Sequence, residues 1–196
     1  MKALGARIFS VLLAIIFLTP AVLGETSAPT YKDGDFWVFK IDRQSTAFIS
    51  SRAIHGVYTV RFRDGKFVTD ADDVQYFSDT VPSVHGLTQN PPWLRFPLTL
   101  SKKWTYEFQY TSDNGRQYSV SAEFSVVGPE TASVPGGTFE AVKIVRSDLG
   151  ARAGKIVHTY FYSSRTGSVV KVDTHYQSGT TIKVELLEYG NKKASP

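Results

Sequence analysis

Apolar and polar side chains alternate along most of the chain with a period of two residues, which is the pattern of a half-buried β-strand. The alternation is clearest between residues 104 and 124, where the apolar positions are Trp104, Tyr106, Phe108, Tyr110, Tyr118, Val120, Ala122 and Phe124. No segment of about 11 residues or more carries the apolar stripe of an amphipathic helix. The sequence therefore predicts an all-β fold.

The turn between these two strands sets which side chains face one another. A three-residue turn at 113–115 places Tyr110 opposite Tyr118 and Phe108 opposite Val120. A two-residue Asn-Gly turn would instead place apolar residues opposite polar ones, because a slip of one position moves every side chain to the other face. We therefore expect a bulged turn whose glycine adopts the left-handed conformation.

Two further turn sequences predict hairpins. Asp64-Gly65 separates the alternating residues 54–63 from residues 66–69, and it pairs Phe62 with Phe67 and Val60 with Thr69. Pro135-Gly136-Gly137 lies between two strand-like segments. Since a strand follows it rather than a helix, the motif predicts a hairpin corner and not a phosphate-binding loop.

The remaining segments complete the predicted fold. Residues 36–41 are apolar on both faces, and three strands at 155–162, 168–177 and 180–189 follow one another with short turns. The whole pattern predicts an antiparallel meander of about ten strands, which forms either a sandwich or a curved half-barrel.

The first residues have the layout of a secretory signal peptide. Lys2 and Arg7 precede the uncharged residues 8–18, and small residues end the segment at Gly24. We expect export to the periplasm or the medium with removal of this segment, and membrane contact only if it stays attached. The expected organisation is a signal peptide at 1–24, a disordered spacer at 25–30, a single β-domain at 31–190 and a disordered tail at 191–196.

Charge and cysteine content exclude several classes of function. The chain has 22 basic and 18 acidic residues, and loss of Lys2 and Arg7 would leave 20 basic residues and change the net charge from +4 to +2. A chain this close to neutral has no basic surface for nucleic acid. The absence of cysteine excludes disulfides, thiolate metal sites and a lipid anchor on an N-terminal cysteine. No cofactor is expected.

Four motifs resemble those of a set of uncharacterised, β-rich proteins that bacteria export. Residues 133–145, SVPGGTFEAVKIV, are similar to its Val-Pro-Ala-Gly-Thr-Phe-x-Ala signature, and residues 159–171, TYFYSSRTGSVVK, to its Tyr-Trp-Tyr-x-Pro-x-x-Gly-x-Val-Val-Lys hairpin. Residues 34–39 resemble its Gly-Asp-x-Trp-x-Tyr opening. Residues 96–104 resemble its Phe-Pro-Leu-x-x-Gly-x-x-Trp segment, with Ser101 where glycine is usual. The resemblance implies an exported β-domain and supplies no catalytic residue.

Candidate catalytic or metal-binding groups are few. No G-x-S-x-G or H-E-x-x-H motif is present. A four-residue turn after Ser163 pairs it with Ser168, which places His158 opposite Asp173, with His175 as a diagonal neighbour. These three residues could bind a metal or transfer a proton, or they could form an ion pair on a solvated face, which we favour.

Acidic residues provide two weaker candidates. Asp70, Asp72 and Asp73 would suit calcium, but the glycine and closing glutamate of a calcium loop are missing. Glycoside hydrolysis needs two carboxylates in one cleft. The available residues are Asp35, Glu107, Glu123 and Glu185, of which only Glu107 and Glu123 are expected near each other.

The aromatic face at residues 104–118 is the last candidate. Its residues either form core beneath an opposing sheet or line a concave surface for an acyl chain or a sugar, namely Trp104, Tyr106, Phe108, Tyr110 and Tyr118. We expect a non-catalytic, exported binding module of the cell envelope, with a hydrophobic small molecule such as a lipid, or an envelope protein, as partner. The alternatives are an assembly domain that acts through an exposed strand edge and, less favoured, a hydrolase using His158, Asp173 and His175.

Overall fold

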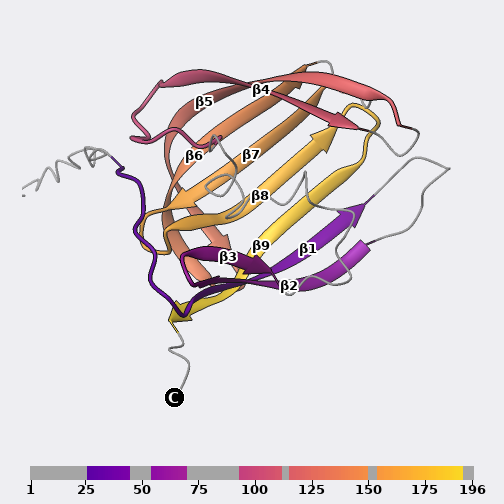
Figure 1. The fold of residues 1–196 in the computed structure, drawn as a ribbon. Coiled ribbons are helices and arrows are strands. Elements are labelled where there is room, and N and C mark those ends of the chain that lie inside the picture. The colour runs from indigo at the N-terminus through magenta and orange to yellow at the C-terminus, as the bar shows by residue number, and fades with distance from the viewer. Residues whose placement is uncertain (1–25, 45–53, 70–92, 112–114, 150–153, 192–196) are drawn as a thin grey trace, which may run out of the picture.

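The described chain forms one open, strongly curved sheet (Figure 1). The structure is a computed structural model, and it describes residues 26–44, 54–69, 93–111, 115–149 and 154–191. The strands are β1 (Asp35–Gln44), β2 (Ile54–Arg63), β3 (Lys66–Thr69), β4 (Lys103–Thr111), β5 (Gln117–Val134), β6 (Gly137–Leu149), β7 (Ile156–Ser163), β8 (Ser168–Tyr176) and β9 (Thr181–Asn191).

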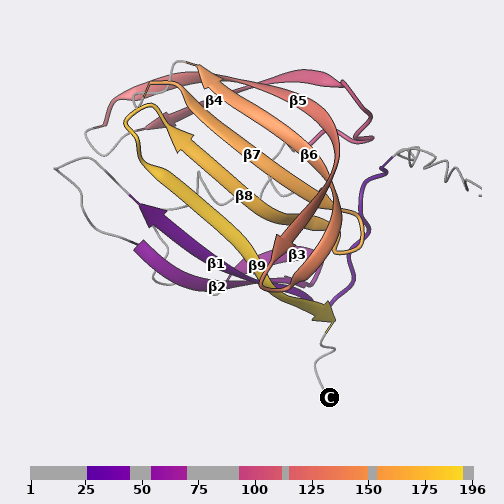
Figure 2. The same cartoon turned by 180° about the vertical axis from the view of Figure 1, so that it is seen from behind.

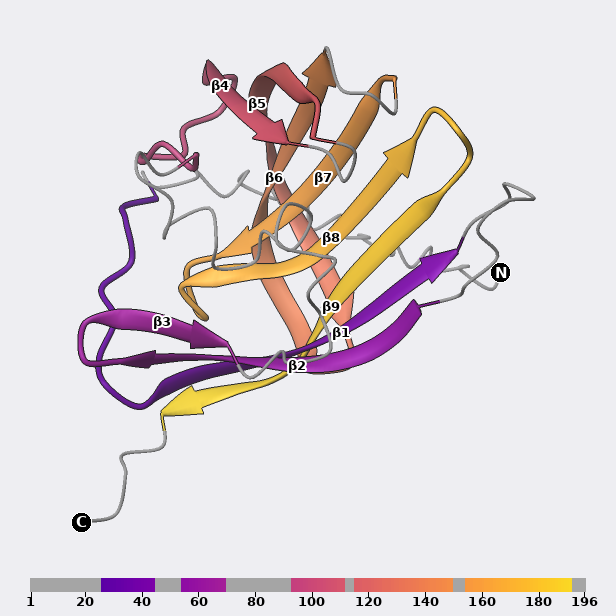
Figure 3. The same ribbon diagram turned by 45° about the vertical axis from the view of Figure 1, so that its right-hand side comes forward.

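All neighbouring strands are antiparallel, in the order β3-β2-β1-β9-β8-β7-β6-β5-β4. The all-β prediction is confirmed, and the curved half-barrel is the arrangement observed, with nine strands among the described residues. The sheet curls from β4 at one margin to β2 and β3 at the other (Figure 3). Among the described residues, no helix is long and apolar enough to span a membrane.

The predicted hairpin registers are confirmed. In β4 and β5, Trp104 lies opposite Phe124 and Tyr110 opposite Tyr118, and the turn glycine, Gly115, has φ of 77°. In β2 and β3, Phe62 lies opposite Phe67 and Val60 opposite Thr69. Both registers follow from keeping apolar side chains on one face.

The tip of the β5–β6 hairpin reaches β9, although β7 and β8 lie between β6 and β9 in the sheet (Figure 2). Ser133 pairs with Thr138 across the tip, so Pro135-Gly136 is a hairpin corner as predicted. The amide of Gly136 donates a hydrogen bond of 2.8 Å to the carbonyl of Leu186. A Cβ at Gly136 would lie 2.9 Å from that oxygen, so only glycine permits this approach.

Residues 93–98 fill part of the concave side. Trp93, Leu94 and Leu98 are buried there. The ring of Trp93 lies 5.4 Å from that of Phe124, and Trp104 stacks on the same phenylalanine at 5.0 Å. The indole of Trp104 also donates to the carbonyl of Trp93 over 2.8 Å. This part of the inner face is therefore packed core.

Residues 26–34 connect the two margins of the sheet at one end. Thr26 forms a bridge with Leu98, and the Tyr31 hydroxyl donates to the carbonyl of Gly167 over 2.7 Å. Backbone and side-chain hydrogen bonds thus hold these residues against the sheet. The predicted signal peptide and nearly all of the predicted tail lie outside the described residues.

Candidate functional site

Polar side chains line up on the inner face of the sheet. Arg146 of β6 lies opposite His158 of β7, which lies opposite Thr174 of β8. Alternation gives Arg146 and Asp148 the same face as the core residue Ile144. All four polar residues are buried, with between 1% and 7% of their surface exposed. We call Arg146, Asp148, His158 and Thr174 the inner polar network.

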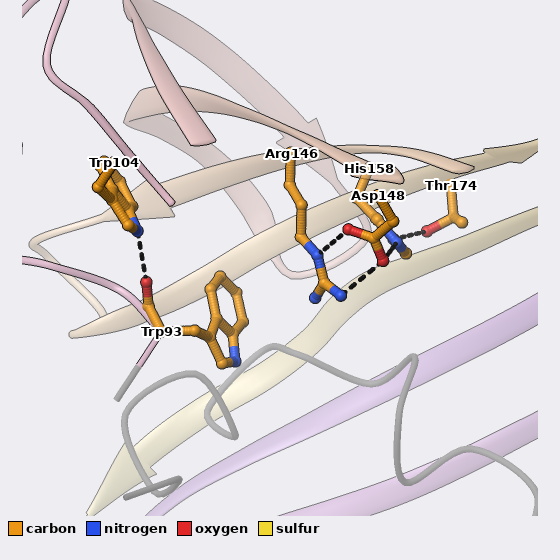
Figure 4. Close-up of polar contacts among 6 residues, drawn as sticks. All are labelled: Trp93, Trp104, Arg146, Asp148, His158 and Thr174. Carbon is orange, nitrogen blue, oxygen red and sulfur yellow. Dashed lines mark hydrogen bonds and ion pairs between the residues drawn. The ribbon is translucent and has the colours of Figure 1, made fainter. Parts of the chain in front are cut away.

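The network is joined by short contacts (Figure 4). Arg146 donates to both oxygens of Asp148, from Nε to Oδ1 and from Nη2 to Oδ2, each over 2.6 Å. His158 Nε2 lies 3.5 Å from Asp148 Oδ2, and His158 Nδ1 lies 2.9 Å from Thr174 Oγ1. The guanidinium of Arg146 also lies over the ring of Phe108, 5.3 Å from its centre.

Burial and the neighbouring charges set the protonation of these groups. Burial lowers the pKa of His158, and the positive charge of Arg146 acts in the same direction, against the hydrogen bond to Asp148. Burial would raise the pKa of Asp148, but the hydrogen bonds from His158 and Arg146 and their charges outweigh it and lower that pKa. A neutral His158, an ionised Asp148 and a charged Arg146 are therefore the native forms at neutral pH.

These protonation states define what the network can do. Donation from His158 Nε2–H to Asp148 leaves Nδ1 to accept from the Thr174 hydroxyl. Such a chain of hydroxyl, imidazole and carboxylate can move a proton. However, Thr174 is 1% exposed and His158 2%, so a substrate in solvent does not reach the hydroxyl. The geometry favours a structural role in which each buried charge has a partner.

Tyr160 packs beside the network. Its ring stacks on that of His158, with the two centres 5.8 Å apart. The residue is fully buried, and burial raises the pKa of its hydroxyl, against the charge and hydrogen bond of the neighbouring Arg146. The hydroxyl of Tyr160 therefore lies close to the guanidinium of the inner polar network.

The expectation that His158 lies opposite Asp173 is wrong. Ser163 does pair with Ser168, but a bulge near Phe161 and Tyr162 shifts the register by one residue, so that Asp173 lies opposite Thr159. Asp173 therefore faces outward, where it forms an ion pair of 3.0 Å with Lys171. His175 is exposed on the same outer face. The three residues do not meet at one site, and the described residues contain no cluster of three metal-ligating side chains.

The predicted aromatic residues whose side chains are described share one face but differ in exposure. Trp104 is buried in the core with Trp93 and Phe124. Tyr106 and Phe108 are half-buried, with ring centres 6.0 Å apart, and Tyr118 is also half-buried. The side chain of Tyr110 lies outside the described part of the structure. A ligand on this face stays a prediction.

The predicted carboxylates do not converge on one cleft. Glu107 and Glu123 are diagonal neighbours, as expected, and both are exposed. Asp35 accepts hydrogen bonds from the Lys32 amide and from Asn191, and Glu185 forms an ion pair with Lys183. The acidic residues Asp70, Asp72 and Asp73 lie outside the described residues.

A groove on the opposite, outer face of the sheet crosses β1, β2 and β9. It has a volume of about 850 Å³ and is lined by Asp33, Gly34, Phe36, Val38, Thr59, Arg61, Phe62, Arg63, Asp64 and Glu188. We call it the outer groove. Phe36 and Val38 alternate with Trp37 and Phe39, which face the core, so β1 presents apolar side chains on both of its faces. The charged residues lie around this apolar floor.

The sequence analysis did not predict the inner polar network or the outer groove, although the sequence contains a signal for each. The signal for the outer groove is the segment 36–41, which is apolar on both faces. This pattern implies that apolar side chains also lie on the outer face. Arg146 and Asp148 lie at alternate positions with Val142 and Ile144 along one strand. These two polar residues therefore point to the same, inner face as the two apolar ones.

The chain was also compared with known proteins. No protein-family model matches it, and no curated protein matches it. Among solved structures it is similar to the hypothetical lipoprotein YmcC from Escherichia coli, with 14% identity, a TM-score of 0.43, and coverage of 82% of this chain and 85% of that one.

Two further structures have similar values. A protein from Parabacteroides distasonis, thought to be a lipoprotein, gives 13% identity, a TM-score of 0.45, and coverage of 86% of this chain and 100% of the other. A protein from Bacteroides fragilis with a YmcC-like fold, thought to be exported, gives 14% identity, a TM-score of 0.36 and the same coverages. At these identities and TM-scores the similarity carries no conclusion about what this chain does.

Proposed function

We propose that this chain is an exported, non-catalytic binding module of the bacterial cell envelope, and that the outer groove holds the apolar part of a small molecule. Export is supported by the basic start, the uncharged residues 8–18 and the small residues up to Gly24. The observation that carries the binding proposal is the groove itself. Its volume of about 850 Å³ lies in the range of ligand sites, and its floor at Phe36 and Val38 is apolar.

The outer groove supports this proposal better than the inner aromatic face does. On the inner face, Trp104 packs against Phe124 and donates to the carbonyl of Trp93, so its ring is part of the core. On the outer face, Val38 is only half-buried. The charged side chains around the groove would contact the polar end of an amphiphilic ligand.

Native mass spectrometry of the protein purified from its own host tests the proposal. We expect an added small-molecule mass on the wild type and its loss in Val38→Glu, because a carboxylate on the groove floor would be desolvated by an apolar ligand. The matched control is Val57→Glu, which makes the same change on the same face, at an exposed valine that does not line the groove. Circular dichroism confirms that both variants keep the β-fold.

The other possible results reject the proposal. An empty wild-type chain, or equal ligand occupancy in Val38→Glu and wild type, contradicts binding in the outer groove. Loss of the ligand in Tyr118→Ala, with retention in Val38→Glu, would place the ligand on the inner aromatic face instead.

A further inference from the structure

The two margins of the sheet are built differently. β3 has four residues and covers only Val60 to Arg63 of β2. β4 has nine residues and pairs with β5 along its whole length without a bulge. Natural edge strands are protected from pairing by shortness, proline, bulges or charged side chains. Of these, β4 has only two charges, and no described strand pairs with its free side.

The outer face of β4 carries two opposite charges with no partner in the described part of the chain. Lys103 and Glu107 are exposed, and neither forms an ion pair or a hydrogen bond with any described residue. They lie on either side of Thr105. Four positions along a strand correspond to about 13 Å, so the two charges are too far apart to neutralise each other.

We propose that β4 pairs antiparallel with β4 of a second copy of this chain, about a two-fold axis at Thr105. In this register Lys103 of each chain faces Glu107 of the other, which gives two ion pairs on the outer face. Continuation of the sheet also satisfies the free backbone groups of both edges.

The spacing of the charges selects this register over its neighbours. Paired residues must lie on the same face of a continuous sheet, so the two-fold axis has to pass through a residue. An axis at Lys103 or Glu107 places like charges opposite each other. An axis at Trp104 or Tyr106 places each charge opposite an uncharged residue. Only the axis at Thr105 pairs Lys103 with Glu107.

Analytical ultracentrifugation of the full chain and its charge variants tests the register. We expect a reversible dimer, with Lys103→Glu and Glu107→Lys each weakening dimerisation by about tenfold, since each replaces two attractive cross-strand pairs by two repulsive ones. The double variant restores two unlike pairs and should return to wild-type affinity. An equimolar mixture of the two single variants should form a heterodimer, because it places two lysines opposite two glutamates.

A matched control separates this coupling from a change in net charge. Lys66→Glu makes the same charge change at an exposed residue on the other margin and should leave dimerisation unchanged. A chain that stays monomeric at all concentrations overturns the proposal. A dimer that is unaffected by either single variant, or single variants that do not recover on mixing, also overturns it. Val38→Glu alters the outer groove, not β4, so failure of the ligand proposal is distinguishable.

Discussion

Ion pairs with the same sequence spacing occur on both faces of the sheet. Lys40 and Asp42, Lys171 and Asp173, and Lys183 and Glu185 are each two positions apart on one strand, with separations of 2.7, 3.0 and 2.8 Å. Arg146 and Asp148 have the same spacing and a separation of 2.6 Å. The first three pairs face outward, whereas the fourth faces the core.

The difference shows that burial, not pairing, decides what an ion pair contributes. The side chains of Arg146 and Asp148 are 9% and 5% exposed, against 24% and 29% for Lys171 and Asp173. Water screens the outer pairs, which stabilise a fold by about 0–1 kcal/mol each. The inner pair has lost its hydration, so each charge depends on the other, and Asp148 depends also on His158.

Removal of the inner carboxylate should have the largest effect. Asp148→Asn keeps the side-chain shape but leaves the buried charge of Arg146 uncompensated, and we expect a loss of about 3–5 kcal/mol in the free energy of unfolding. The matched control, Asp173→Asn, removes the partner of Lys171 and should cost about 1 kcal/mol or less. Urea unfolding followed by circular dichroism measures both. Equal losses would show that the two faces do not differ.

Thr174→Val should have an intermediate effect. It preserves side-chain volume but removes the hydroxyl that donates to His158, and a buried unsatisfied imidazole nitrogen destabilises a fold by about 1–3 kcal/mol. Thr159→Val, on the outer side of β7, is the control and should change stability by about 0.5 kcal/mol or less. A loss no larger than that of the control would mean that the His158–Thr174 hydrogen bond is unimportant.

A fall in pH should gradually lower the stability of the fold through the buried groups of the inner polar network. The pKa of His158 in the folded chain is below its ordinary value of 6.5, so as the pH falls below 6.5 the unfolded chain binds a proton that the folded chain does not. Stability is therefore lost over this window, by at most about tenfold in the folding equilibrium constant per pH unit. The lowered pKa of Asp148 adds a loss of the same sign below its ordinary value of 3.8.

The control for the acid effect is His158→Gln. Its unfolding free energy should vary less than that of the wild type between pH 7 and pH 5. Parallel curves for the two proteins would assign the acid sensitivity to other groups.

The sequence was sufficient for the fold wherever one register alone kept apolar residues on a single face. The β4–β5 hairpin is such a case, because its aromatic residues alternate strictly up to the turn. It was not sufficient at β7 and β8. Tyr160, Phe161 and Tyr162 are all buried, so no alternation of apolar and polar residues shows which of them face inward. The bulge there moved Asp173 away from His158, and with it the predicted site. Consecutive aromatic residues were the available signal of that bulge.

The inner polar network could not be assembled from sequence for a related reason. Arg146 and Asp148 are visible as inward-facing residues, but their contact with His158 depends on the β6–β7 register, which the sequence leaves open between residues 149 and 156. The outer groove depends on strands from both ends of the chain, and no local pattern indicates that β1 lies beside β9.

The pairing of β1 with β9 affects the order in which the sheet can fold. β1 pairs with β2 and β9 alone, so the β1–β3 unit has no strand pairing with the rest of the described sheet except through β9. Contacts of such long sequence separation form slowly. Truncation at residue 180 would therefore remove the strand pairing between β1–β3 and the meander, and also the Leu186 carbonyl that anchors the β5–β6 corner.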